Sequence, residues 1–347
     1  MITLATLATL ALTASAIAAP SIARAQRLFR STEPVELTFT MSLRQFVRER
    51  DSTKLNDFGA EMAYRDSAGT EVRIPVELRA RGHFRRQARN CGFPPVRWDA
   101  KKQDIEGTLF QGLTRMKITT NCRPGNDDYE QYVLAEYAIY RAYQILSPLH
   151  FRTRLARITY KDSAQATADV TSWAILREDD DEMGRDNNMP VLDQPGALFD
   201  DLVQKQLMTT TLFAYMIGNT DGSISALHNI VLLRDTTSFS IHPVMFDFDF
   251  SGVINARYAT APPNLGIRRV TDRLHRGPCK TVEEWKPIFE HFLSKRAAID
   301  SVYDAIPQMN PSKAKAAKDY LDEFWKIIAD DRRAKREIAD QCQKIGM

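Results

Sequence analysis

Residues 217–223 read Ile-Gly-Asn-Thr-Asp-Gly-Ser, residues 228–230 read His-Asn-Ile, and residues 243–252 read Pro-Val-Met-Phe-Asp-Phe-Asp-Phe-Ser-Gly. The pattern predicts an apolar helix that leads into a polar loop, followed by two short strands joined by a turn. The second strand ends in Asp-x-Asp. No other part of the chain points so directly to a reaction.

The polar residues at the end of these strands are predicted to bind a divalent metal ion. Asn229 and Asp247 supply the hard oxygen atoms that Mg²⁺ (or Mn²⁺) prefers, and the phosphates of ATP would complete the coordination. Asp249 lies on the same side of the strand as Asp247, because side chains alternate with period two. Two adjacent carboxylates repel each other unless a cation or base lies between them. The alternative is an exposed hairpin end with solvated carboxylates.

Asp221 is the candidate catalytic residue. Phosphoryl transfer uses a carboxylate to orient the acceptor hydroxyl and to take its proton. The alternative is an ordinary turn aspartate, since Asn-Thr-Asp-Gly suits a turn. His228, beside this loop, is interpreted as a structural histidine rather than a ligand.

Lys117 and Glu136 are a candidate ion pair for holding the nucleotide phosphates. Lys117 lies in a predicted strand, and Glu136 lies in the amphipathic helix predicted over residues 129–146. Lys101 and Lys102 compete for the phosphate-binding role. Both members of the pair also suit an ordinary strand and helix surface, and that alternative stays open.

The order of these elements resembles the CotH family of secreted kinases over roughly residues 70–300. The resemblance rests on short pieces: Arg81-Gly82, the strand with Lys117, the helix with Glu136, Ala174–Glu178, Asp221 with His228-Asn229, and Asp247-Phe248-Asp249. It implies an atypical protein-kinase-like fold, with Arg81 in a phosphate-side turn and Glu178 at the end of a hinge that contacts adenine through backbone groups. The chain has no glycine-rich G-x-G-x-x-G loop.

The predicted fold class is α+β, with two lobes and the ligand between them. Residues 27–178 form the strand-rich N-terminal lobe, and residues 179–347 form the helix-rich C-terminal lobe that carries the catalytic loop and the Asp-x-Asp motif. Strands are expected over residues 34–47, 58–100, 113–119, 154–160, 171–177, 230–233 and 239–246. Further helices are expected over residues 197–217, 282–295, 297–306 and 311–338, with a loop over residues 178–188.

Residues 1–26 resemble a cleaved signal peptide, because an apolar run of small residues precedes Ala-Arg-Ala-Gln. An uncleaved anchor is the alternative. Cys91, Cys122, Cys279 and Cys342 are an even number of cysteines, as is usual in exported proteins. The favoured pairing is Cys91–Cys122 and Cys279–Cys342. We therefore expect an exported protein, periplasmic or extracellular, without a membrane span after cleavage.

The functional expectation is an exported Mg/ATP-dependent phosphotransferase whose acceptor is a hydroxyl group, on a protein or on a small molecule. The net charge of +3 is too mild to indicate nucleic acid as a partner. Compartments outside the cytoplasm are poor in ATP, which favours a second interpretation, an inactive kinase-like binding or scaffold protein of the envelope. A third is a structural Ca²⁺ site at the acidic motif.

Overall fold

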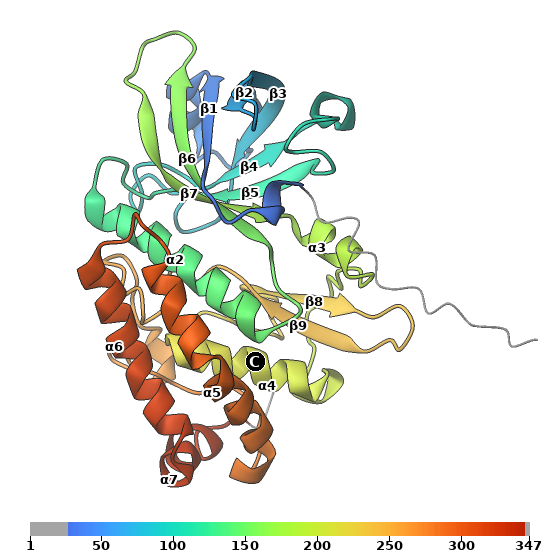
Figure 1. Ribbon diagram of the computed structural model, residues 1–347, viewed down its shortest axis with the longest axis vertical. Helices are drawn as coiled ribbons and strands as arrows, with labels where there is room; N and C mark the ends of the chain where they lie inside the picture. The colour runs from blue at the N-terminus through green and yellow to red at the C-terminus, as the bar shows by residue number, and fades with distance from the viewer. Residues whose placement is uncertain (1–26, 344–347) are drawn as a thin grey trace, which may run out of the picture.

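The computed structural model describes residues 27–343, and its N-terminal half is a closed seven-stranded barrel (Figure 1). Around the barrel the strand order is β1-β2-β3-β4-β5-β7-β6. The strands are β1 (Val35–Met41), β2 (Phe58–Arg65), β3 (Glu71–Ala80), β4 (Val96–Asp99), β5 (Arg115–Thr119), β6 (Thr153–Asp162) and β7 (Val170–Glu178). Strand β1 closes the barrel, because it pairs antiparallel with β2 and parallel with β6.

The expectation of a two-lobed protein-kinase-like fold is wrong, although the mixture of helices and strands is as expected. The closed barrel overturns it, since the strand-rich half has no open sheet edges. Alternating hydrophobicity correctly indicated most of the strands. It carries no information about which strand edges pair, and the parallel β1–β6 pairing joins segments more than 100 residues apart, from Val35↔Ala156 to Met41↔Asp162.

The barrel interior is a hydrophobic core of its own. Side chains that point inward from the strands, such as Phe39, Trp98 and Tyr160, are at most 1% exposed. Phe39 stacks on Tyr160 with ring centroids 5.5 Å apart. The period-two pattern seen in the sequence is therefore the alternation between barrel interior and surface.

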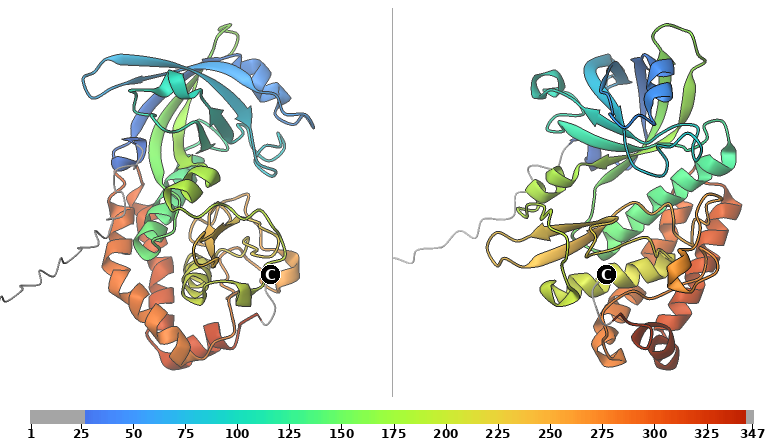
Figure 2. Two further views of the ribbon diagram at one scale, coloured as in Figure 1. Left: turned by 90° about the vertical axis from the view of Figure 1, so that its right-hand side faces the viewer. Right: turned by 180° about the vertical axis from the view of Figure 1, so that it is seen from behind.

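Helices and one hairpin form the other half. Helix α2 (Asp127–Leu146) lies between the barrel and the helices below it, contacting β6 and β7 on one side and α5 on the other (Figures 1 and 2). The other long helices are α4 (Gln204–Ile217), α5 (Val282–Asp304) and α6 (Pro311–Ile328), and α7 (Asp331–Ala334) precedes a π-helical turn over Lys335–Ala339. Strands β8 (Ile230–Arg234) and β9 (Ile241–Met245) form the hairpin.

Three local expectations fail. The strand predicted over residues 34–47 ends at Met41, and α1 (Leu43–Glu49) follows it. The predicted loop over residues 178–188 contains helix α3 (Asp180–Asp186), whose N-terminus is capped by Asp179. Two helices expected over residues 282–306 are the single helix α5. Short 3₁₀ turns occupy Arg27–Arg30, Lys102–Ile105, Phe199–Asp201 and Pro263–Leu265.

The predicted disulfide pairing is confirmed, because Cys91 bonds to Cys122 and Cys279 bonds to Cys342. Two disulfides agree with an oxidising compartment. Within residues 27–343 no helix has the length and apolar character needed to cross a membrane. The predicted signal peptide over residues 1–26 lies outside the described residues.

Candidate functional site

Asp221 lies in the loop after α4, where the chain reverses. The helix ends at Gly218, whose φ of +67° is left-handed, and a side chain there would collide with the hydroxyl of Tyr320. Past this turn, the Asn219 side chain accepts a hydrogen bond from the Asp221 backbone N–H at 2.8 Å. The loop therefore holds the Asp221 backbone in one conformation.

Two neighbours contact the Asp221 carboxylate. The Asn229 Nδ2 group donates to Oδ2 at 2.9 Å and to the Asp221 carbonyl at 3.2 Å. His228 Nε2 lies 3.4 Å from Oδ1, and this hydrogen bond raises the pKa of His228. Asp221 remains partly exposed, so its carboxylate can meet a group from solvent. His228 thus touches the candidate catalytic residue, which the sequence interpretation did not anticipate.

The β8–β9 hairpin places Asn229 and Asp247 at the same end. Ile230 pairs with Met245, and the next N–H, from Phe246, donates to the Asn229 carbonyl at 3.1 Å. Asn229 and Asp247 both have left-handed backbones, with φ of +53° and +61°. Such conformations are uncommon outside glycine and often occur at functional sites.

The donor atoms at this end of the hairpin suit a magnesium ion. Oxygen Oδ1 of Asp247 is buried and has no hydrogen-bond partner among the described residues. Asn229 directs its amide nitrogen to Asp221, which leaves its amide oxygen for another contact. Within residues 27–343 no group of three or more His, Cys, Asp or Glu side chains could hold a metal by itself. A metal here would therefore need further ligands from a nucleotide or water.

Two buried carboxylates, those of Asp249 and Glu136, lie next to Asp247. Asp249 pairs with Arg85 at 3.3 Å, and Glu136 on α2 accepts a long hydrogen bond of 3.5 Å from the Phe248 N–H. Burial and the charge of Asp247 raise the pKa of Glu136 to about 7, and burial likewise raises that of Asp249 well above its usual range. Asp247 behaves oppositely. Although burial opposes it, the positive charges around Asp247 lower its pKa.

Arginines supply those positive charges. The charge of Arg85 lowers the pKa of Asp247 most, followed by those of Arg81 and Arg177. Arg177 is buried between the rings of Phe151 and Phe246, at 4.0 and 4.6 Å. Arg81 donates a weak hydrogen bond of 3.4 Å to Thr119, while its Nε is buried without a partner in the described part of the chain. The site therefore combines acidic groups with guanidinium groups whose hydrogen-bonding capacity is not filled.

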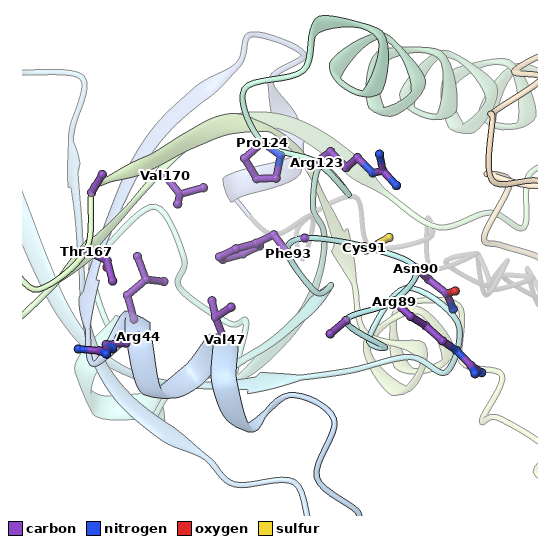
Figure 3. A pocket seen from close by; sticks show the side chains of 14 residues that line it. Arg44, Val47, Arg89, Asn90, Cys91, Phe93, Arg123, Pro124, Thr167 and Val170 are labelled. Carbon is purple, nitrogen blue, oxygen red and sulfur yellow. The ribbon is translucent and has the colours of Figure 1, made fainter.

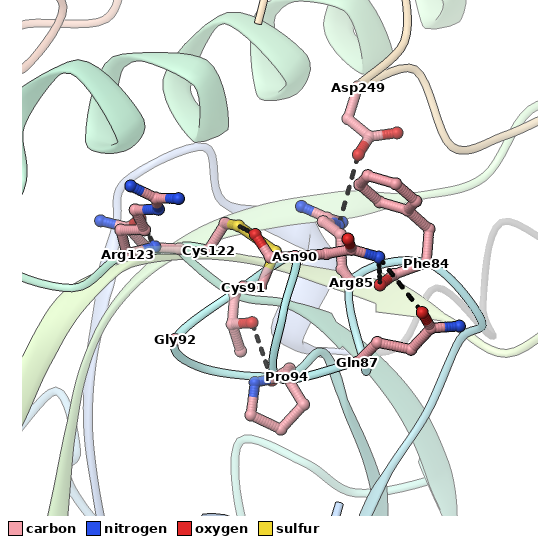
Figure 4. Close-up of a disulfide and its surroundings, with 12 residues drawn as sticks. Phe84, Arg85, Gln87, Asn90, Cys91, Gly92, Pro94, Cys122, Arg123 and Asp249 are labelled. Carbon is pink, nitrogen blue, oxygen red and sulfur yellow. Dashed lines mark hydrogen bonds and ion pairs between the residues drawn. A yellow bond between two sulfur atoms is a disulfide. The ribbon is translucent and has the colours of Figure 1, made fainter. Parts of the chain in front are cut away.

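Arg85 and Arg177 were not singled out by the sequence analysis. Residues 79–86 are rich in arginine, a pattern that suits a solvated strand edge as well as a phosphate-binding site. Figure 4 shows Arg85 reaching Asp249 from the loop that the Cys91–Cys122 disulfide fastens. Arg177 had no signal, because it reads as an ordinary strand residue.

The predicted Lys117–Glu136 ion pair is not formed among the described residues. Lys117 Nζ instead lies 2.5 Å from Asp180 Oδ2 and 3.9 Å from Asp179 Oδ2, both at the start of α3. Burial and the nearby charge of Arg177 lower the pKa of Lys117 to about 8. This pairing could not be foreseen, because α3 was itself predicted to be a loop.

Glu178 ends β7, but its side chain is committed to a structural contact. The Arg152 guanidinium donates to its Oε2, with the Nε group at 2.8 Å. Only the backbone of Glu178 would remain for a ligand, and that backbone N–H donates to the Arg152 carbonyl at 3.2 Å.

Arg276, in the arginine-rich segment over residues 268–276, also contacts the loop that carries Asp221. Its Nη1 donates to the carbonyl of Thr220 and, at 3.0 Å, to the carbonyl of Gly222. These hydrogen bonds fix the backbone on both sides of Asp221. Burial lowers the pKa of Arg276.

Comparison with known proteins gives no family assignment. No protein-family model matches the chain, and no curated protein matches it. The site must be interpreted from its own chemistry.

Proposed function

We propose that this protein is an exported phosphotransferase that uses Mg²⁺ and ATP to phosphorylate a hydroxyl group, on a protein acceptor. One observation carries the proposal. The hairpin brings Asn229 and Asp247 to the same end, Asn229 contacts Asp221, and a buried carboxylate oxygen of Asp247 has no partner among the described residues. Carboxylate and amide oxygens in this combination suit a metal shared with phosphates. The short sequence motifs that resemble the CotH family agree with this proposal.

Each residue has a role in the proposed reaction. Asn229 and Asp247 would hold Mg²⁺, which neutralises charge on the β- and γ-phosphates when bound. Asp221 orients the acceptor hydroxyl. The acceptor oxygen bonds to the γ-phosphorus, the bond from that phosphorus to the β,γ-bridging oxygen breaks, ADP leaves, and the hydroxyl proton goes to Asp221.

The cationic groups beside Asp247 suit the phosphates. Arg81 and Arg177 can donate in pairs to phosphate oxygens, as guanidinium groups do. Lys117 forms an ion pair with Asp180. It lies on β5, directly opposite Arg177 on the neighbouring strand β7. Asp249 and Glu136 act as a second layer. They hold Arg85 and the segment around Phe248, and Asp249 is the further candidate metal ligand.

Calorimetric titration of Mg·ATP tests the proposal. The mature protein should bind Mg·ATP, and Asp247→Ala should weaken binding at least about tenfold, as expected when a ligand of a bound metal is lost. Asp319→Ala, an exposed aspartate on α6, is the matched control and should bind like the wild type. Absence of binding by the wild type, or equal binding by Asp247→Ala, would refute the proposed site.

A binding or scaffold protein without turnover is the second candidate. The observation that favours it is the Lys117–Asp180 contact, which leaves Lys117 without the expected contact to Glu136. In that case Mg·ATP would bind weakly or not at all, and no ADP would form. A calcium-dependent shift in melting temperature without an effect of ATP would instead indicate a structural ion.

A further inference from the structure

Away from the site around Asp221, a cavity of about 640 Å³ lies on the barrel side of the molecule. It is bordered by α1, by the loop with the Cys91–Cys122 disulfide, by the segment before α2 and by the turn between β6 and β7. Its centre is apolar, formed by side chains such as Val47, Phe93 and Val170 (Figure 3). The volume lies in the range of cavities that bind ligands.

Arginines surround this apolar floor. Arg44 lies on one side, and Arg89 and Arg123 lie on the other (Figure 3). None of the residues that line the cavity is acidic. All three side chains are exposed, and among the described residues none of them forms an ion pair. Arg89 contacts Gln87, and Arg123 stacks on Tyr129. Three cationic groups around one apolar centre are complementary in charge to an anionic occupant.

The walls of the cavity are held in place by polar contacts. Asp51 accepts hydrogen bonds from the Ala88 N–H at 3.0 and 3.1 Å, and Asp162 accepts one from the Leu43 N–H at 3.0 Å. These two nearby carboxylates are therefore occupied in holding the walls.

The disulfide loop is fixed as well. The N–H groups of Gly92 and Phe93 donate to the Cys122 carbonyl at 2.7 and 3.2 Å, and Arg50 donates to the Gly92 carbonyl. A preformed cavity loses little entropy when it binds a ligand.

We propose that this cavity binds an acidic peptide segment in which an apolar side chain is flanked by two or more carboxylates. The arrangement of charge selects a peptide over a single-headed amphiphile. A fatty acid carries its charge at one end and would use one arginine, whereas the arginines here stand on opposite sides of the floor. The inference does not depend on the proposed phosphotransfer, because no residue of that site lines this cavity.

Selection from a random library of peptides of about seven residues, which span at most ~25 Å when extended, tests the proposal. Peptides retained by the wild type should be enriched in Asp and Glu around an aromatic or aliphatic residue. By fluorescence anisotropy, the double variant Arg44→Glu/Arg89→Glu should bind them about tenfold more weakly. Arg48→Glu is the matched control on the same helix, outside the cavity, and should bind like the wild type.

Three results would overturn the proposal. They are a selection without enrichment, enrichment of basic peptides, and equal affinity of the wild type and the double variant. A competition experiment with sodium dodecanoate tests the alternative occupant, a single-headed amphiphile. Displacement of the peptide by dodecanoate at a lower concentration than by the unlabelled peptide would assign the cavity to a single-headed amphiphile. Melting temperatures of all variants near that of the wild type would show that the fold is retained.

Discussion

At the scale of single residues, the site depends on how neighbours divide positive and negative charge. The arginines around Asp247 lower its pKa, whereas burial raises the pKa of Asp249 a short distance away. Environments that push the pKa values of adjacent carboxyls apart are typical of functional sites. Asp221 lies in the loop after α4, where its carboxylate is partly exposed and contacts Asn229 and His228.

Asp221→Asn separates catalysis from nucleotide binding. The amide keeps the shape of the side chain but cannot take a proton, so transfer of γ-labelled phosphate from ATP to casein should fall about 10²–10⁴-fold. Calorimetry should show Mg·ATP affinity close to that of the wild type. A transfer rate equal to the wild type's would remove Asp221 from its proposed role. Asp319→Asn serves as the surface control.

His275 gives a pH dependence that is independent of the site. It is buried, its Nδ1 lies 2.9 Å from the Ile338 carbonyl, and burial lowers its pKa from 6.5 to about 4. Between these values the unfolded chain binds a proton that the folded chain does not, so the free energy of unfolding falls as the pH drops from 6.5 toward 4.

The size of this effect follows from the shift of 2.5 pH units (6.5 minus 4), on the order of 3 kcal/mol. Urea unfolding at pH 7 and pH 4.5 should show that His275→Asn loses less stability on acidification than the wild type. The variant also loses packing at both pH values, so the difference between the two is the measured quantity. Identical losses in both proteins would contradict a buried neutral His275.

At the scale of elements, hydrogen-bonded ends determine where helices begin. The residue before α5, Thr281, accepts from the Glu284 N–H at 3.3 Å, and Glu284 accepts from the Thr281 N–H at 2.7 Å. This reciprocal pair is a capping box. It provides hydrogen-bond acceptors for two N–H groups that have no acceptor within the helix.

Thr281→Ala should lower the free energy of unfolding by about 1 kcal/mol, because one of these groups loses its partner. Thr236→Ala, at an exposed threonine in the β8–β9 turn, controls for the change of side chain alone. Chemical denaturation of both variants provides the measurement. A cost at Thr281 no larger than at Thr236 would show that the cap does not stabilise α5.

The β8–β9 hairpin is the element that the sequence predicted best, and the segment after β7 is the one it predicted worst. The hairpin partners are close in sequence, so two short apolar runs on either side of a turn indicate the pairing. Residues 179–186 are acidic and polar, and they form α3 because Asp179 caps the first turn and Met183 is buried. A local pattern cannot show that burial in advance.

At the scale of the whole molecule, two hydrophobic cores meet along α2. One core fills the barrel and the other lies among the helices and the hairpin, and α2 packs between them (Figure 1). Each half also has its own disulfide. Cys91–Cys122 joins the loop between β3 and β4 to the segment before α2. Cys279–Cys342 joins the segment before α5 to the chain beyond α7.

Removing either disulfide should destabilise the protein by about 4 kcal/mol, since each tie restricts the unfolded chain. The pair Cys279→Ser/Cys342→Ser should cost slightly more than Cys91→Ser/Cys122→Ser, because the cysteines are 63 rather than 31 positions apart. Urea unfolding under oxidising conditions measures both. In the presence of reductant, the wild type should lose stability in the same way, and no loss would contradict this account.

The sequence by itself determined the features that depend on neighbouring residues. These are the alternation of the barrel strands, the apolar helix before Asp221, and the hairpin that joins Asn229 to Asp247. The favoured cysteine pairing also followed, because Cys91 and Cys122 flank strands of one region.

Only the tertiary structure decided the features that join distant segments. The barrel closes through β1 and β6, Lys117 turns to Asp180 instead of Glu136, and Arg85 reaches Asp249 across more than 160 residues. The physical reason is the same in each case. Periodicity reports which face of an element is buried, but a strand edge or a buried charge takes its partner from whatever the closed fold places beside it.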